Sequence, residues 1–258
     1  MSETNHTPEW EVYFCDIADR PACISVDLAL EQLAPVAGKQ RAFELVVALQ
    51  QPDADGFPES EKEWEALEQI EEALVEQFQN SLQALFVGKI LHDGKRSFYF
   101  YSGQEALPDV LAANVMQQFP DYTYSTNSLE DADWGLYLDF LFPEPVDMQS
   151  IKNARIIRMM QEQGDQEQIP RPVSHSLHFA TEADRALFRS KAGEMGYTLV
   201  DESKSENGSE PPYSLIISRM GTLTEEAIHT ATLELWQLAE EHQGSYEGWE
   251  AQVVREND

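Results

Sequence analysis

The chain contains little cysteine and has no long apolar run. Only two of its 258 residues are cysteines, Cys15 and Cys23, which lie on the two predicted arms of one hairpin. A disulfide across that hairpin is geometrically feasible, but in a chain of this size without a secretory signal we expect two free thiols. No stretch approaches the roughly 18 consecutive apolar residues of a membrane-spanning helix, and Met1–His6 lack the basic start of a leader peptide. We therefore expect a cytoplasmic protein without membrane contact.

Positive charge is also scarce. The chain has 17 lysines and arginines against 47 aspartates and glutamates, a formal net charge of −30. Nucleic acid would meet a repulsive field on such a protein, which argues against direct binding of nucleic acid. The same field favours basic partners. Hydrophobic residues make up 42% of the chain, which is enough for a sizeable core.

The sequence lacks the motifs of the common catalytic and metal sites. It contains no Cys-x-x-Cys, His-Glu-x-x-His, Gly-x-Ser-x-Gly, Walker or dinucleotide-binding sequence. His175 and His178 form the one close histidine pair, and residues three apart on a strand face opposite sides, so they are poorly placed to share a metal. His175 shares its predicted face with Leu177 and Phe179, which favours a histidine in the core or at its rim. We therefore predict no catalytic residues, no metal and no cofactor.

Hydrophobic periodicity divides the first 145 residues into strands and helices. Alternating apolar residues predict strands, and apolar residues at steps of three and four predict helices. The expected elements are strands Trp10–Asp16, Ala22–Leu30 and Ala42–Leu49, helix Ser60–Leu85, strands Phe86–His92 and Ser97–Tyr101, helix Gln104–Gln118, and strands Tyr122–Asn127 and Trp134–Phe142. This order indicates an α+β sheet with its helices on one side.

A proline-rich break then interrupts every predicted element. Proline removes a backbone donor and restricts the residue before it, so Phe142-Pro143-Glu144-Pro145 predicts a domain boundary. The resulting domains are residues 1–145 and residues 146–258. The first holds 27 acidic and 7 basic residues, a net charge of −20, and the second holds 20 and 10, a net charge of −10.

The second domain begins with a predicted linker helix, Asp147–Gln163, and continues in the order strand, helix, strand, strand, helix, strand. The expected strands are Ser174–Phe179, Tyr197–Ser203, Tyr213–Met220 and Trp249–Val254, with helices after Thr181 and Thr224. This order is the split βαβ, ferredoxin-like plan. The predicted fold class is therefore α+β, with two domains that each form an antiparallel-type sheet with helices on one face.

Landmarks in this second half resemble a known family. They are Asn153, Met159-Met160, Gly164-Asp165, Arg171-Pro172, His175, His178-Phe179, Gly196-Tyr197, Ala239-Glu240 and Tyr246-Glu247-Gly248-Trp249. In this order they resemble the regulator of ribonuclease E activity B family over about residues 150–255. The first 142 residues resemble a bacterial family of unknown function.

The resemblance implies a non-catalytic, ferredoxin-like regulator. Members of the regulator family are acidic and bind ribonuclease E in its non-catalytic scaffold region, which alters RNA turnover. The charge of −30 agrees, since an acidic protein suits an arginine-rich partner segment.

The candidate partner-binding residues lie near the end of the chain. Tyr246 and Trp249 have two interpretations: core side chains, or exposed rings that bind an arginine with help from Glu247 and Glu250. Trp236 lies off the apolar stripe of its predicted helix, so it is exposed or in contact with the first domain.

Three hypotheses remain open from the sequence. The leading one is an acidic regulator that binds a basic segment of an RNA-processing enzyme such as ribonuclease E. The second is an enzyme or small-ligand-binding protein with a pocket in residues 1–145, lined by Tyr99, Tyr101, Tyr122, Tyr124 or Trp134. The third is a homodimer that pairs through an exposed sheet edge.

Overall fold

The structure is a computed structural model that describes residues 6–103, 108–205 and 211–255. It divides into two compact units, Met1–Asp147 and Met148–Asp258. We call these the N-terminal and C-terminal units and describe each by itself. None of the described helices is both long and apolar enough to cross a membrane.

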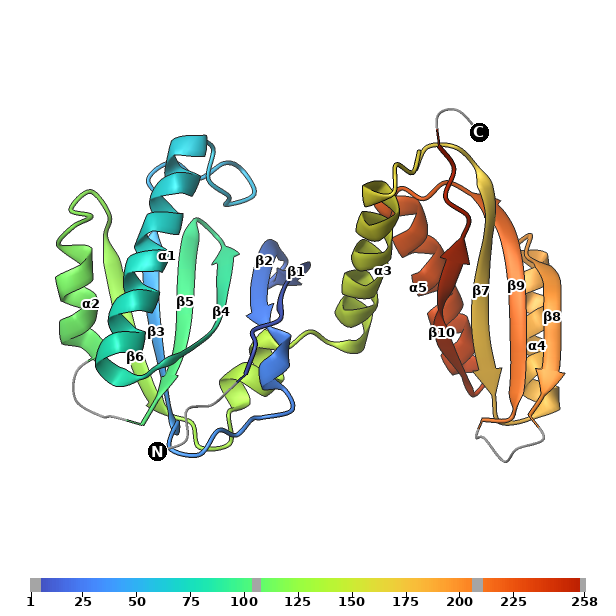
Figure 1. The fold of residues 1–258 in the computed structure, drawn as a ribbon, viewed down its shortest axis with the longest axis horizontal. Helices are drawn as coiled ribbons and strands as arrows, with labels where there is room; N and C mark the ends of the chain where they lie inside the picture. Colours follow the sequence, from blue (N-terminus) through green and yellow to red (C-terminus); the bar gives the residue numbers. More distant parts are fainter. Residues whose placement is uncertain (1–5, 104–107, 206–210, 256–258) are drawn as a thin grey trace. The chain divides into compact units, whose positions relative to one another are not determined.

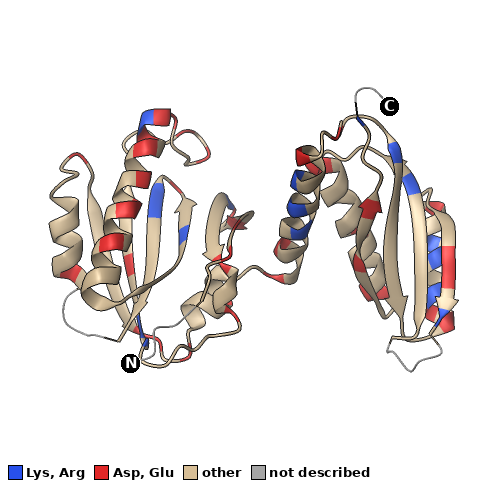
Figure 2. Ribbon diagram, viewed as in Figure 1, with Lys and Arg blue, Asp and Glu red and all other residues tan. Residues whose placement is uncertain are grey.

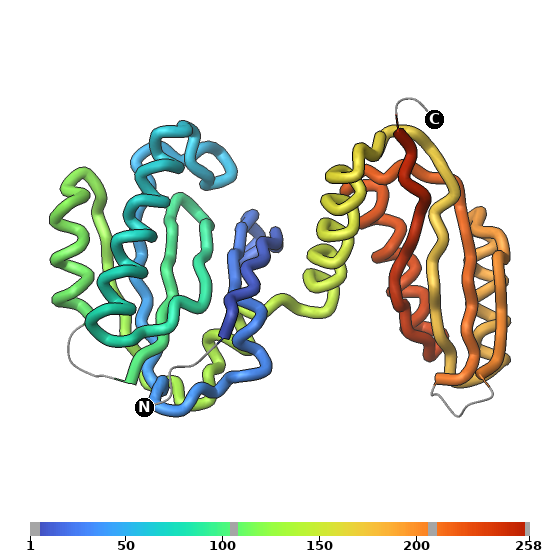
Figure 3. The backbone as a smooth tube through the Cα atoms, viewed as in Figure 1, coloured from blue at the N-terminus to red at the C-terminus, as the bar shows by residue number. Residues whose placement is uncertain are grey.

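The N-terminal unit is built on a six-stranded antiparallel sheet with the strand order β1-β2-β4-β5-β3-β6 (Figures 1 and 3). Of the helix predicted over Gln104–Gln118, residues 104–107 lie outside the described residues. Along the chain the elements are β1 (Trp10–Ile17), β2 (Arg20–Asp27), the short η1 (Leu28–Leu30), β3 (Arg41–Ala48), α1 (Glu61–Leu82), β4 (Leu85–His92), β5 (Lys95–Ser102), α2 (Pro108–Met116), β6 (Tyr124–Glu130) and the π-helical η2 (Leu136–Leu141).

Helix α1 follows from its cap and its apolar stripe. The Ser60 side chain accepts a hydrogen bond from the Glu63 backbone N–H at 3.3 Å, which satisfies one free donor of the first turn. The helix ends at Leu82 because Gln83 takes a left-handed conformation. Its buried residues pack with those of α2 against one face of the sheet: Leu67, Ile70, Leu74, Phe78 and Leu82 from α1, and Ala112, Val115 and Met116 from α2.

The segment after β6 covers the opposite face of the same sheet, and the strand predicted over Trp134–Phe142 is wrong. The Asp131 carboxylate accepts hydrogen bonds from the backbone N–H groups of Gly135 and Leu136 at 2.9 and 3.0 Å, which starts a helical turn. Apolar residues occupy every second position from Trp134 to Phe142 as in a strand, but Leu136–Leu141 form a π-helix that buries Tyr137 and Leu141. Trp134 stacks on Tyr101 with ring centroids 4.1 Å apart.

The C-terminal unit is a four-stranded antiparallel sheet in the order β10-β7-β9-β8 (Figure 1). This order and the element sequence confirm the ferredoxin-like prediction. The elements are α3 (Pro145–Glu162), β7 (Arg171–Phe179), α4 (Glu182–Glu194), β8 (Thr198–Lys204), β9 (Tyr213–Gly221), α5 (Glu225–Glu241) and β10 (Gly244–Ala251).

Three helices cover one face of this second sheet. Phe188 of α4 and Leu235 of α5 pack on Leu177 of β7, and Ile157 of α3 joins Trp249 in an adjoining cluster. The other face of the sheet has no helix on it among the described residues. We call it the open face.

Candidate functional site

A β-bulge decides where the predicted site residues of β10 point. Tyr246 pairs with Leu177 and Trp249 with His175, and the register shifts between Tyr246 and Gly248. In a regular strand, residues three apart face opposite sides, but the extra residue of the bulge turns both rings toward the helices. Gly248 has φ +150°, a conformation that favours glycine. The Tyr-acidic-Gly-Trp sequence is therefore the sequence of a bulge that buries two aromatic rings.

Both rings are held inside by hydrogen bonds. Tyr246 is 9% and Trp249 6% exposed. The Tyr246 hydroxyl and His175 Nδ1 are 2.8 Å apart, and Trp249 Nε1 donates to Asn153 Oδ1 at 2.9 Å. Asn153 in turn donates to Thr232 Oγ1 at 2.8 Å. Tyr246 and Trp249 are therefore core side chains and not exposed anchors, so only their acidic neighbours are available to a partner.

Burial also keeps the His175–Tyr246 pair uncharged at neutral pH. It lowers the pKa of His175 from 6.5 to about 4, with a smaller contribution from nearby Arg219. Burial likewise raises the pKa of Tyr246 well above its ordinary value. A neutral, inaccessible pair of this kind stabilises the core and is not placed to exchange protons with a substrate.

A buried ion pair explains two further landmarks of the sequence. The Arg171 guanidinium donates to the Asp165 carboxylate and to the backbone carbonyl of Gln252, the latter at 3.0 Å. Asp165 also accepts a hydrogen bond from the backbone N–H of Val254 at 2.8 Å. These contacts join the start of β7 to the chain that follows β10. The Gly-Asp and Arg-Pro landmarks therefore stabilise the fold, through the contacts of Asp165 and Arg171.

The acidic residues of the predicted site reach the open face instead. Glu250 pairs across the strands with Ser174, and Ser245 with His178, and paired residues share a face. Glu247, in the bulge, accepts a hydrogen bond from Ser245 Oγ at 2.7 Å and lies 3.5 Å from His178 Nδ1. The Ser245 hydrogen bond holds the pKa of Glu247 below its ordinary value, so its charge persists. We call Ser174, His178, Ser245, Glu247 and Glu250 the open-face patch.

Trp236 is not part of the open-face patch. It lies on α5, half-buried against the cluster that contains Leu177 and Phe188, on the helix side of the sheet. The five predicted residues therefore separate into three sets: the exposed Glu247 and Glu250, the buried Tyr246 and Trp249, and the half-buried Trp236.

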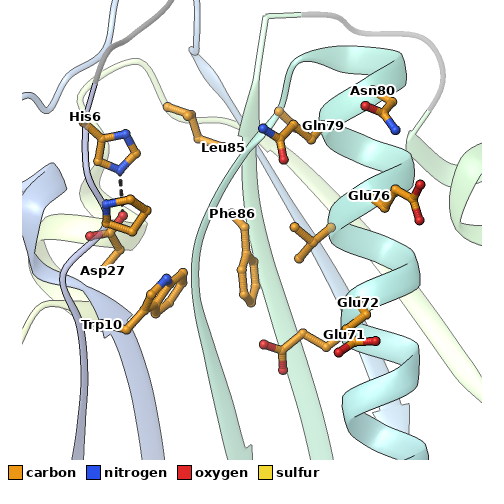
Figure 4. A pocket seen from close by; sticks show the side chains of 13 residues that line it. His6, Trp10, Asp27, Glu71, Glu72, Glu76, Gln79, Asn80, Leu85 and Phe86 are labelled. Carbon is orange, nitrogen blue, oxygen red and sulfur yellow. Dashed lines mark hydrogen bonds and ion pairs between the residues drawn. The ribbon is translucent and has the colours of Figure 1, made fainter.

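The N-terminal unit contains a groove of about 550 Å³ between α1 and the β1–β2 hairpin (Figure 4). Trp10 and Phe86 form its aromatic side, with ring centroids 5.1 Å apart. Glu72 and Glu76 of α1 line the opposite wall. At one end His6 Nε2 is 2.7 Å from the buried Asp27 carboxylate. The groove has the volume of a small-ligand site. It differs from such a site because it is open along its length and has an apolar floor.

The tyrosines predicted to line a pocket do not form one. Tyr101 and Trp134 are buried in a stack, and the Tyr99 hydroxyl donates to Glu44 at 2.9 Å. Tyr124 is exposed on edge strand β6, and Tyr122 borders a separate cavity of about 340 Å³. Sequence reasoning did not find the groove beside Trp10. The alternating pattern of β1 places Trp10 on the apolar face of the strand, but it does not show that none of the described helices covers this face.

Two family models match the chain, and they meet close to the boundary between the N-terminal and C-terminal units. A model of a family of unknown function, DUF695, matches residues 8–142, and the model described as regulator of ribonuclease activity B matches residues 150–251. Both resemblances drawn from the sequence are thereby confirmed. No curated protein matches the chain.

Two solved structures are distantly similar. One is an unknown protein from Galdieria sulphuraria, at 10% identity and a TM-score of 0.22, covering 84% of this chain and 99% of its own. The other is a protein provisionally described as a glycine cleavage system transcriptional repressor, at 9% identity and a TM-score of 0.22, covering 83% and 99%. TM-scores this low do not indicate a shared overall fold.

Proposed function

Because the chain belongs to the DUF695 family of unknown function through residues 8–142 and matches regulators of ribonuclease activity over residues 150–251, we propose that it regulates a ribonuclease. The observation that carries this proposal is the second match, on a unit whose strand order is ferredoxin-like. The regulation is exerted by protein–protein contact and without catalysis. Its target is ribonuclease E or a similar RNA-processing enzyme.

We further propose that the open-face patch contributes to this contact. Glu247 and Glu250 are exposed beside small serine side chains on a face without a helix. Residues 146–258 carry a net charge of −10, so the approach of a basic partner segment is accelerated by the field. A partner held mainly by charge is released as salt screens the interaction.

The alternative of an enzyme or a small-ligand pocket in residues 1–145 receives less support. Its proposed tyrosine lining is dispersed between the core, an edge strand and a second cavity. Among the described residues, no three histidine, cysteine, aspartate or glutamate side chains are grouped as metal ligands.

The test is the affinity of the full chain for ribonuclease E, measured by calorimetry at low and moderate salt. The double variant Glu247→Gln/Glu250→Gln removes the two charges of the open-face patch and keeps the side-chain size. We expect it to weaken binding about tenfold at low salt, a modest loss for two partly screened charges. The matched control is Glu240→Gln/Glu241→Gln, which removes the same charge from the exposed end of α5.

Two outcomes contradict the proposal at different levels. Absence of binding by the unmodified chain removes the regulatory function on ribonuclease E. Equal weakening by the patch variant and the α5 control keeps the function and removes the open-face patch from the interface.

A further inference from the structure

The six-stranded sheet of the N-terminal unit is wider than its two helices. Neighbouring strands lie about 4.8 Å apart and packed helices about 10 Å apart, so one helix covers about two strands. Helix α1 contacts β4 and β5, and α2 contacts β6. The β1–β2 hairpin has no helix over this face in the described part of the unit (Figures 1 and 3). The sheet therefore has an unfilled position for a third helix, beside α1.

The uncovered face of β1 is apolar. Trp10, Val12 and Phe14 are 41%, 50% and 69% exposed, and they alternate along the strand, so they share one face. Phe14 pairs with Cys23, which pairs with Leu91 of the α1-side core, so this is the helix-bearing face. On the opposite face of β1, Tyr13 is only 5% exposed. An edge strand with three exposed apolar side chains in a row is typical of an interaction surface.

The wall beside this face is acidic. Figure 2 shows acidic residues repeated along α1. Glu71 is neutralised by Lys89, with Nζ to Oε1 at 2.7 Å, and by Arg96 at 3.7 Å. Glu72 and Glu76 line the groove with no ion pair among the described residues. The groove thus combines an apolar floor with two uncompensated carboxylates on one side.

We propose that this groove receives an amphipathic helix of a partner protein that is basic along one side. Its apolar face packs on Trp10, Val12 and Phe14, and its lysine or arginine side chains reach Glu72 and Glu76. Binding of a helix in a groove is a common mode of peptide recognition. The apolar row extends along β1 beyond the groove, which suits a helix better than a small molecule.

Charge argues against a second copy of this chain as the occupant. Residues 1–145 carry a net charge of −20, so two such surfaces repel one another. The inference does not depend on the proposed ribonuclease function, since it concerns a different unit and a different surface.

The experiment measures binding of labelled 18-residue helical peptides to the full chain by fluorescence polarisation. The probe carries leucine on one face of the helix, at steps of three and four residues, and lysine on the rest of its surface. A leucine–glutamate peptide of the same pattern and a serine–lysine peptide without an apolar face are the reference probes. We expect binding of the leucine–lysine peptide only, because both the apolar face and the charge are needed.

Two double variants locate the site, one in the apolar row of β1 and one on the acidic wall of the groove. Val12→Ser/Phe14→Ser and Glu72→Gln/Glu76→Gln should each raise the Kd of the leucine–lysine peptide about tenfold, as loss of buried apolar area or of two opposed charges does. The matched controls are Leu129→Ser, on the opposite edge strand β6, and Glu59→Gln/Glu65→Gln, outside the groove. These controls should change the Kd less than about twofold, as surface substitutions away from a site do.

Three results overturn the proposal. Equal weakening by Glu72→Gln/Glu76→Gln and by its control Glu59→Gln/Glu65→Gln shows that only net charge attracts the peptide. Equal binding of the serine–lysine peptide shows that the apolar row is not used. A dimer in sedimentation that dissociates in Val12→Ser/Phe14→Ser assigns the face to a second copy.

Discussion

Two edge strands, β1 of the N-terminal unit and β10 of the C-terminal unit, differ in the exposure of the aromatic residues on the helix-bearing face of their sheets. In the C-terminal unit the sequence landmarks Tyr246 and Trp249 are buried and hydrogen-bonded. In the N-terminal unit Trp10 and Phe14 belong to no landmark and are exposed on an edge strand. The landmark residues Tyr246 and Trp249 therefore report how the chain packs, whereas the exposed row on β1 carries no landmark.

Removal of the buried indole should be the most damaging change. Trp249→Ala leaves a cavity in the C-terminal core and deprives Asn153 Oδ1 of a donor. We expect a loss of about 3–5 kcal/mol in the free energy of unfolding of this unit, the usual cost of a buried tryptophan. Urea unfolding followed by circular dichroism measures it. Trp10→Ala, the exposed counterpart, should cost much less; equal losses would contradict the burial difference.

Acid should weaken the C-terminal unit through His175. The pKa of His175 is 6.5 in the unfolded chain and about 4 in the folded chain. Between these pH values the unfolded chain binds a proton that the folded chain does not bind. Stability is therefore complete above pH 6.5 and falls as pH decreases through this window, by about 3 kcal/mol at 1.36 kcal/mol per pH unit.

The substitution His175→Gln isolates that contribution. Glutamine does not titrate, so the variant should not lose this stability as the pH falls. The difference in unfolding free energy between the variant and the unmodified chain should therefore change between pH 6.5 and about pH 4. Ser176→Ala, on the same strand and on the open face, is the control; it removes no titrating group and should retain the full pH dependence. If His175→Gln follows the unmodified chain at every pH, the histidine is not the responsible group.

The bulge glycine should be sensitive for conformational reasons alone. No atom lies within 4 Å of a Cβ placed on Gly248, but its φ of +150° disfavours any other residue. Gly248→Ala should cost about 1–3 kcal/mol of unfolding free energy. Gly193→Ala is the control, because this helical glycine also has open space but an ordinary φ. It should stabilise the unit by about 0.5–1 kcal/mol, and a similar loss at both positions would remove the backbone explanation.

The exposed row on β1 should matter least for stability. Val12→Ser/Phe14→Ser should alter the free energy of unfolding of the N-terminal unit by less than about 0.5 kcal/mol per residue, since both side chains are already largely in water. A larger loss, measured by thermal and urea unfolding, would mean that the row is part of the core and not a surface for partners.

Much of the fold could be predicted because its signals are local. Short segments contain the apolar stripe of α1 and its cap at Ser60. They also determine the order of elements in the second half of the chain. The segment around Trp134 was misread, since Asp131 starts a helical turn that an alternating pattern of apolar residues does not reveal.

The candidate sites were harder to predict because they depend on the pairing of distant segments. Tyr246 and Trp249 share a face only through the bulge against β7, and periodicity does not show a bulge. The groove beside Trp10 exists only because two helices cover a six-stranded sheet incompletely. A glycine between two aromatic residues, directly before the strand predicted over Trp249–Val254, was the one available signal for the bulge.

Regulation of a ribonuclease by contact is tested most directly by a cleavage assay. Ribonuclease E is mixed with a labelled RNA and increasing amounts of the full chain at low salt. We expect the cleavage rate to fall to a plateau, the RNA itself not to be bound by the chain, and Glu247→Gln/Glu250→Gln to shift the half-maximal concentration upward. An unchanged cleavage rate at saturating concentrations of the chain would contradict it.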